Sequence, residues 1–317
     1  MKNDTLELKL SPIQIEDVGQ VNSGRLVSHG GRAAGLALLT SAQGAHAVLF
    51  APLDGLAPGQ PNPLFKPQSP FGTPSWDIGT TRAGAALVWA KPGSAICPLV
   101  LSIVNAPDRI LTNHYPMGVF QNPRFVRGNS DGVAVTAVTH DGKGSILALY
   151  TDAFVSAHAA YATLPSAGPG TIVDGLLLRQ GTGYLLFVKI LATGQRGPER
   201  KDLRGESVQQ GILHCLRLNG QLQPVGTSLH LIGDAAIFEF DADVSGEVVF
   251  LLATNEKGYR AAKIVVSESK LDVAVSPDVL SKPELLSPSV LATGGKALAT
   301  VIQQNALQRR TILIGEF

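Results

Sequence analysis

Two arginines and a tryptophan beside an aspartate are the residues best suited to binding a small molecule. Arg25, the pair Trp76 and Asp77, and Arg124 each follow a turn in a short strand-like segment, and these segments recur about 50 residues apart. A guanidinium offers forked donors to a carboxylate, a phosphate or a sugar, and an indole beside it offers a stacking face. This pattern predicts recognition of a small anionic or sugar-like ligand.

Further candidates lie near these segments or at matching positions. The stretch NHYPMGVFQNP (113–123) places His114 and Tyr115 before the strand of Arg124, and Glu239 begins a later strand of the same kind. A pair of catalytic carboxylates could be built from Asp77 and Glu239, but their sequence positions do not fix their separation. No catalytic set is therefore assigned. The predicted ligand-binding residues are Arg25, Trp76, Asp77, His114, Tyr115, Arg124 and Glu239.

Other site chemistries have little support in the sequence. The seven histidines are scattered and form no H-x-x-x-H or acid-rich ligand pattern, so no metal site and no cofactor are predicted. The sequence has neither a G-x-S-x-G nucleophile elbow nor a phosphate-binding loop. Cys97 and Cys215 lie in apolar strand-like runs and are expected to be buried, reduced thiols.

Composition argues for a globular protein without a bulk charge. The 26 basic and 25 acidic residues nearly cancel, which disfavours nucleic acid and anionic membranes as partners. The N-terminus MKNDTLELKL lacks the apolar stretch of a secretory signal, and no window approaches the roughly 18 apolar residues of a membrane span. We therefore expect a cytoplasmic protein, with a protein or a small anionic or carbohydrate ligand as its partner.

The elements that must position these residues are strands. Apolar runs of about five to seven residues, such as GLALLT, YLLFVKI and EVVFLLAT, are bounded by Gly, Pro, Asn or Asp throughout the chain. Helical periodicity is almost absent. The sequence therefore predicts an all-β protein.

The strands also repeat. The glycines that precede the strongest strand of each group are Gly35, Gly84, Gly132, Gly183, Gly246 and Gly295, which gives intervals of 49, 48, 51, 63 and 49 residues. The long interval contains LATGQRGPERKDLRGESVQQ (191–210), a charged connection roughly 14 residues longer than its counterparts. We expect its segment 194–206 to be a solvated loop, with a partner-binding arm as the alternative.

Each repeat has a turn, three strong strands and a weaker outer strand, and so resembles a blade of a β-propeller. The chain is thus similar to the six-bladed β-propeller superfamily over residues 1–317, as one domain, without the signatures of the WD40, kelch or sialidase repeats. LDVAVSP (271–277) is the outer strand of the fifth repeat, and the sixth repeat stops at TILIGEF. The matching LELKLSP (6–12) is therefore predicted to complete the last blade from the N-terminus.

In a propeller the first strand of each blade lines a central channel. Alternation predicts that Arg25, Ser75, Asp77, Arg124, Thr171, Glu239 and Ser289 face it. They could bind a ligand, or they could pair with one another and line a water-filled channel. The favoured function is a non-catalytic binding or protein-interaction propeller. The alternatives are an enzyme with its site at the channel mouth, such as a glycosidase, lyase or lactonase, and a structural subunit.

Overall fold

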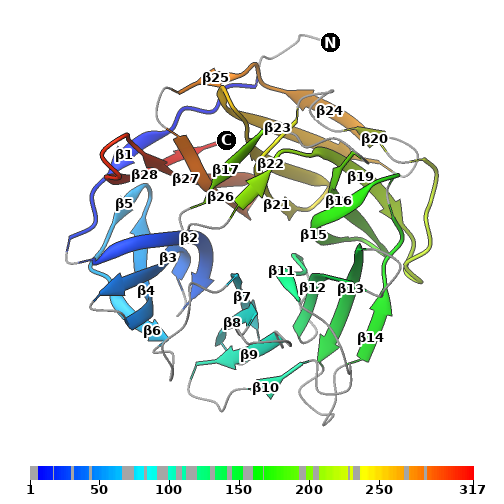
Figure 1. Ribbon diagram of the computed structural model, residues 1–317, viewed down its shortest axis with the longest axis horizontal. Coiled ribbons are helices and arrows are strands. Elements are labelled where there is room, and N and C mark those ends of the chain that lie inside the picture. Colours follow the sequence, from blue (N-terminus) through cyan, green and yellow to red (C-terminus); the bar gives the residue numbers. More distant parts are fainter. Residues whose placement is uncertain are drawn as a thin grey trace. The chain divides into compact units, whose positions relative to one another are not determined.

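The computed structural model describes most of the chain, and every regular element in that part is a strand (Figure 1). The described residues are 6–16, 18–29, 32–42, 45–65, 75–81, 84–90, 99–104, 109–111, 120–128, 133–140, 145–152, 160–166, 168–192, 198–202, 207–227, 229–230, 236–267, 271–281 and 284–317. His114, Tyr115 and Cys97, named in the sequence analysis, lie outside them.

The strands form six antiparallel blades and one small hairpin, divided between two compact units. Unit 1 comprises Met1–Gln68, Pro198–Gln210 and Ile232–Phe317, and unit 2 comprises Ser69–Gly197 and Gly211–Leu231. The fold is the predicted one, an all-β six-bladed β-propeller whose blades are mostly four-stranded. The prediction that residues 1–317 form a single domain stays a prediction.

Unit 1 holds the first, fifth and sixth blades and the hairpin. The first blade contains β2 (Gln20–His29), β3 (Arg32–Ala42), β4 (Ala45–Asp54), β5 (Ala57–Pro58) and β6 (Asn62–Phe65). The fifth contains β21 (Glu239–Ser245), β22 (Val248–Thr254), β23 (Gly258–Val266), β24 (Leu271–Val275) and β25 (Val279–Leu280). The sixth contains β26 (Glu284–Thr293), β27 (Lys296–Gln304), β28 (Arg310–Glu316) and β1 (Ser11–Ile13). The hairpin pairs β17 (Glu199–Lys201) with β18 (Ser207–Gln209).

Unit 2 holds the second, third and fourth blades. The second contains β7 (Trp76–Thr81), β8 (Gly84–Ala90), β9 (Leu99–Ile103) and β10 (Arg109–Ile110). The third contains β11 (Gln121–Phe125), β12 (Val133–His140), β13 (Ser145–Asp152) and β14 (Ala160–Thr163). The fourth contains β15 (Thr171–Gln180), β16 (Gly183–Leu191), β19 (Ile212–Leu218) and β20 (Leu229–His230).

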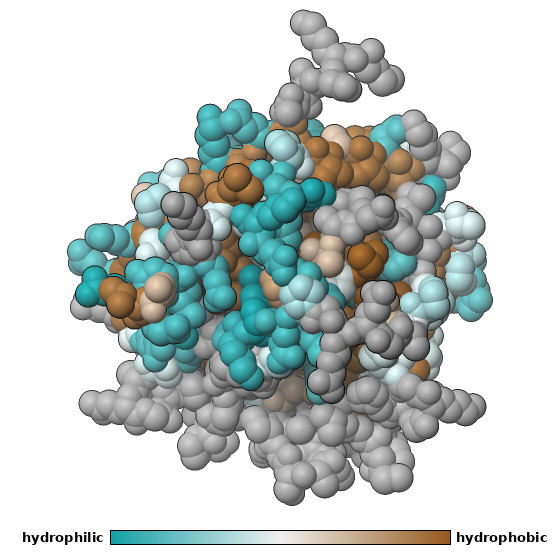
Figure 2. Space-filling view, turned by 45° about the horizontal axis from the view of Figure 1, so that its top comes forward, coloured by the Kyte–Doolittle hydropathy of each residue, from teal (hydrophilic) through white to brown (hydrophobic). Residues whose placement is uncertain are grey.

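The second strand of each blade explains why the apolar runs are so strong. In β16, residues Leu185–Val188 are all at most 1% exposed, so successive side chains on both faces of the strand are buried. A strand covered on both faces reads as a continuous apolar run instead of an alternating one. Figure 2 shows that apolar residues also appear at the surface beside hydrophilic ones.

The N-terminal strand completes the last blade, as predicted. β1 pairs with β28 in the register Ser11↔Ile314 to Ile13↔Ile312, and the two strands lie side by side in Figure 1. The predicted bounds were wrong, because pairing begins at Ser11 and not at residue 6. The preceding residues pack instead of pairing: Leu8 is 2% exposed, and its carbonyl accepts a hydrogen bond of 2.7 Å from the Tyr259 hydroxyl of β23. The N-terminal segment thereby contacts both the fifth and the sixth blade.

Two further expectations can be compared with the structure. Cys215 is buried and forms no disulfide, as predicted, and its burial raises the pKa of the thiol to about 12. In the described part of the chain there is no helix of the length and apolarity that a membrane span requires.

Candidate functional site

The first strand of a blade has one edge without a neighbouring strand, and side chains from the preceding blade bind its backbone there. In unit 2, Asp77 Oδ2 on β7 accepts a hydrogen bond of 2.8 Å from the backbone N–H of Phe125 on β11. In unit 1, Asp241 Oδ2 on β21 accepts one of 2.9 Å from Val290 N–H on β26, and Ser289 Oγ accepts one of 2.9 Å from Leu26 N–H on β2. These inner-strand ties satisfy backbone donors that an open strand edge would leave unpaired.

Bulges interrupt four of the first strands, and side chains in two of these bulges, Asn122 and Ser287, contact the next blade. We call these two residues the second row. The register shifts between Val21 and Ser23, Gln121 and Arg124, Ile172 and Asp174, and Leu286 and Ser289. Asn122 and Ser287 lie in two of these bulges and have φ angles of 46° and 52°. A left-handed φ is unusual for a residue other than glycine, and bulges often redirect a side chain near a functional site.

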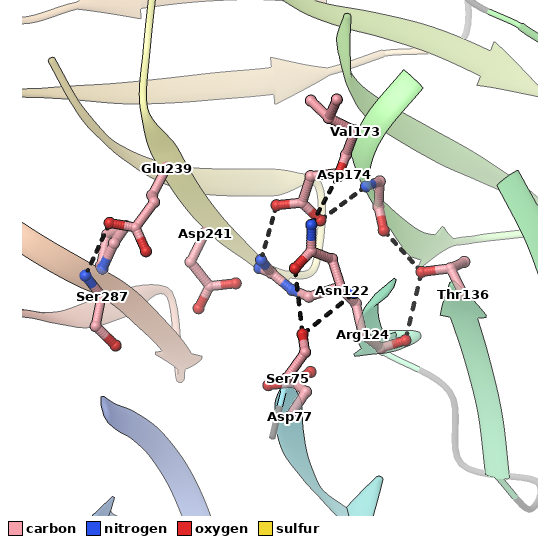
Figure 3. A network of polar contacts seen from close by, with 12 residues as sticks. Ser75, Asp77, Asn122, Arg124, Thr136, Val173, Asp174, Glu239, Asp241 and Ser287 are labelled. Carbon is pink, nitrogen blue, oxygen red and sulfur yellow. Dashed lines mark hydrogen bonds and ion pairs between the residues drawn. The ribbon is translucent and has the colours of Figure 1, made fainter. Parts of the chain in front are cut away.

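In unit 2 the second row and the charged residues form a connected network (Figure 3). Asn122 accepts a hydrogen bond from Ser75 Oγ (3.2 Å) and donates one to the Val173 carbonyl (2.7 Å). Arg124 Nη1 lies 3.4 Å from Asp174 Oδ2, with side-chain exposures of 5% and 12%. This arginine is therefore part of a buried ion pair between β11 and β15.

Asp77 is engaged by Arg127. Arg127, just after β11, donates to Asp77 Oδ1 at 3.2 Å and to the Ile78 carbonyl at 3.1 Å. Trp76 is 4% exposed, and strand alternation puts it on the face of β7 opposite Asp77. In unit 2, Asp77 thus serves as a tie between neighbouring strands, and Trp76 is a buried side chain.

In unit 1 a serine links an arginine to a carboxylate. Ser287 Oγ on β26 accepts a hydrogen bond of 3.0 Å from Arg25 Nη1, and Ser287 N–H donates one of 3.2 Å to Glu239 Oε2. Figure 3 shows Glu239 directed toward the Ser287 backbone. Arg25 is half-buried and also donates to the Pro288 carbonyl at 3.3 Å, while the Glu239 side chain is 25% exposed. We call Arg25, Ser287 and Glu239, which come from three blades, the inner-strand site.

The hairpin β17–β18 adds charged residues next to Glu239 of the inner-strand site. Arg200 Nη2 donates to Glu239 Oε2 at 2.8 Å and to Thr254 Oγ1 at 3.0 Å. Asp202 is 8% exposed. Burial of Arg310 lowers the pKa of that arginine, and the negative charge of Asp202 partly offsets this shift. The expectation of a solvated loop was thus wrong for Arg200 and Asp202, because both side chains are buried against the blades.

The predicted residues are distributed over both units. Arg25 and Glu239 meet at Ser287 in unit 1, whereas Trp76, Asp77 and Arg124 belong to unit 2. The grouping of these five residues into one ligand site with His114 and Tyr115 stays a prediction.

Sequence reasoning missed several inner-strand residues. Thr171 is exposed and Asp174 is buried, with a bulge between Ile172 and Asp174. The prediction that Thr171 faces the channel stays a prediction. Asp174 lies 50 residues after Arg124, and Asp241 lies 48 residues before Ser289, so the repeat itself contained the signal. The sequence did not single out Asn122, Arg127 or Ser287, and it indicated Arg200 only as one charged residue of the segment 194–206.

In the described part of the chain, no group of three or more His, Cys, Asp or Glu side chains is placed to hold a metal ion. The inner-strand carboxylates of Asp77, Asp241 and Glu239 are engaged by hydrogen-bond donors. Asp243 likewise accepts hydrogen bonds from Val244 N–H and Ala292 N–H, at 2.8 and 2.9 Å.

No protein-family model matches the chain, and no curated protein matches it in sequence. Solved structures do match it in fold. A mutant of Trypanosoma rangeli sialidase that displays trans-sialidase activity has a TM-score of 0.60 at 7% identity, over 99% of this chain and 58% of that one. The endosialidase of phage phi92 has a TM-score of 0.58 at 8% identity, over 98% and 69%. The polysaccharide lyase Uly1 has a TM-score of 0.54 at 7% identity, over 96% and 90%. At these identities the likeness concerns the fold.

Proposed function

We propose that this chain is a non-catalytic binding propeller that recognises a small anionic or sugar-like ligand at the inner-strand site. The observation that carries the proposal is the link made by Ser287 between Arg25 and Glu239. It holds a forked donor and a carboxylate acceptor together on three blades, and both side chains retain some exposure. A fixed guanidinium donor suits an anionic group of a ligand, and a fixed carboxylate acceptor suits its hydroxyl groups. The predicted cytoplasmic location is part of this proposal.

The engagement of the acids favours binding over catalysis. Asp77 and Asp241 are 0% exposed, and Asp243 is 8% exposed. All three accept backbone hydrogen bonds from neighbouring strands. A catalytic carboxylate has to reach the substrate, whereas these carboxylates hold the blades together.

An enzyme acting on a glycan is the second candidate, and the exposure of Glu239 favours it. With a quarter of its side chain accessible, Glu239 is the inner-strand acid best able to meet a substrate. The phage endosialidase and the polysaccharide lyase share the fold, which lends this alternative general support by analogy. Binding of a protein partner at the inner-strand site is a third candidate function.

A thermal-shift screen of sugar acids, neutral sugars and small dicarboxylates tests the proposal. A ligand that binds the folded state but not the unfolded state raises Tm, by an amount that grows with the logarithm of its concentration above Kd. We expect one of these classes to stabilise the wild-type chain, and we expect Arg25→Ala to lose that shift. Arg309→Ala, which removes an exposed arginine, should retain it. Stabilisation that persists in Arg25→Ala would contradict the assignment of the site. Cleavage of the ligand by the wild type but not by Glu239→Gln would support the enzyme instead.

A further inference from the structure

Arg200 is bound by a compact set of groups at one end of the fifth blade. Its Nη2 donates to Glu239 Oε2 at 2.8 Å and to Thr254 Oγ1 at 3.0 Å, and its guanidinium carbon lies 4.2 Å from the centroid of the Phe238 ring. A carboxylate, a hydroxyl and an aromatic face are the groups that recognise a planar cation. We call Phe238, Glu239 and Thr254 the cradle.

The cradle belongs to the blade, but the side chain that fills it does not. Glu239 and Thr254 face each other across β21 and β22, and Phe238 directly precedes β21. Arg200 comes from the hairpin β17–β18, inside the one connection that exceeds the repeat length. The backbone of this hairpin is paired internally, from Glu199↔Gln209 to Lys201↔Ser207. The Arg200 side chain attaches it to the cradle.

Arg200 does not use the cradle fully. Its side chain is 7% exposed, yet its buried Nε has no hydrogen-bond partner among the described residues. A buried donor without a partner costs free energy, so the fit of Arg200 in the cradle is incomplete.

We propose that the cradle is a guanidinium-binding site that the chain fills with its own Arg200, and that an arginine side chain of a partner peptide competes for it. The hairpin then acts as an internal competitor, since the partner's arginine can enter only as Arg200 leaves. This inference goes beyond the proposed ligand site. Glu239 belongs to both sites, but Arg25 has no part in the cradle, so binding of a guanidinium does not require the proposed ligand.

Chemical rescue tests the cradle directly. Arg200→Ala empties it and should lower Tm by several degrees, because Glu239 loses its arginine. Low-millimolar methylguanidinium should then restore a large part of the loss, whereas methylammonium at equal concentration, with the same charge but no fork, should not. The double variant Arg200→Ala with Glu239→Gln should show no rescue. Lys201→Ala, an exposed neighbour on the same strand, should match the wild type throughout.

Equal stabilisation by methylguanidinium and methylammonium, or equal rescue of the double variant, would overturn the proposal. If the alanine protein does not fold, Arg200→Gln retains one donor for Glu239 and allows the same comparison. Competition is measured on the wild-type chain with N-acetylarginine amide. We expect the backbone amides of β17–β18 to exchange hydrogen faster in the presence of N-acetylarginine amide than in the presence of N-acetyllysine amide. Equal exchange rates with the two compounds would contradict displacement of the hairpin by arginine. These readouts use no sugar or acid ligand, so their failure is separate from failure of the proposed function.

Discussion

Removal of the Asp241 carboxylate should weaken the junction between the fifth and the sixth blade. Asp241 is 0% exposed, and its Oδ2 accepts hydrogen bonds from Val290 N–H at 2.9 Å and from Ser289 Oγ at 3.2 Å. In Asp241→Ala both donors lose this acceptor, and the Val290 N–H stays at a buried strand edge. The perturbation therefore tests whether the inner-strand acids act as structural ties.

The expected cost follows from these two bonds. A hydrogen bond to a charged group contributes about 1.5–3 kcal/mol, and an unsatisfied buried donor costs about 1–3 kcal/mol. Because both bonds share one oxygen, their energies do not add fully, and we expect Asp241→Ala to lose about 2–4 kcal/mol of unfolding free energy. Asp241→Asn keeps one oxygen as an acceptor and should lose less.

Urea unfolding followed by tryptophan fluorescence and circular dichroism measures this loss. Asp54→Ala, at an exposed aspartate of the same unit, is the matched control and should stay within about 0.5 kcal/mol of the wild type. If Asp241→Ala unfolds at the same urea concentration as Asp54→Ala, the acids are not structural ties. A catalytic or ligand-binding role for Asp241 would then become the better explanation.

Deleting residues 1–13 removes the strand that pairs with β28 and should cause aggregation or loss of cooperative unfolding; a truncated chain that melts normally as a monomer would contradict the closure of the last blade. Arg124→Ala should lower the unfolding free energy by about 3–5 kcal/mol, because it strips the arginine from a buried ion pair, whereas a role in ligand binding alone leaves stability unchanged in the same urea assay. A hydrogen bond from Arg260 lowers the pKa of Asp278 in the folded protein. The stability that this pair contributes is therefore fully present above the unfolded pKa of about 3.9 and is lost as the pH falls through the lower folded pKa. The unfolding free energy should accordingly fall less steeply with decreasing pH for Asp278→Asn than for the wild type. Equal pH dependence of the two proteins would show that the pKa of Asp278 is not lowered in the folded state. Because burial raises the pKa of Cys215 to about 12, its thiol should react with a disulfide reagent at pH 8 far more slowly in the folded than in the unfolded Cys97→Ser protein, and equal rates would show that it is accessible.

Most of the fold could be predicted from local pattern. Apolar runs bounded by turn residues indicate strands because a strand buried on both faces needs apolar side chains along its whole length, as Leu185–Val188 illustrate. Their repetition near 49 residues predicted six blades, and the likeness of LELKLSP to LDVAVSP predicted that the N-terminus completes the last one. The bounds of that strand were missed, since the Leu8 carbonyl accepts a hydrogen bond from the Tyr259 hydroxyl and pairing with β28 starts at Ser11. The hairpin β17–β18 was missed as well.

The sequence by itself thus determined the strand order, the repeat and the position of Arg25, Asp77, Arg124, Glu239 and Ser289 on first strands. The tertiary structure decided what those residues contact. Alternation assigns a side chain to a face only while the strand stays regular, and the bulge between Ile172 and Asp174 interrupts the alternation in β15. The partners of these residues on neighbouring blades, or on the hairpin outside the repeat, lie at sequence separations of 39 to 263 residues. Contacts over such separations depend on how blades pack together, and no local pattern in the chain encodes that packing.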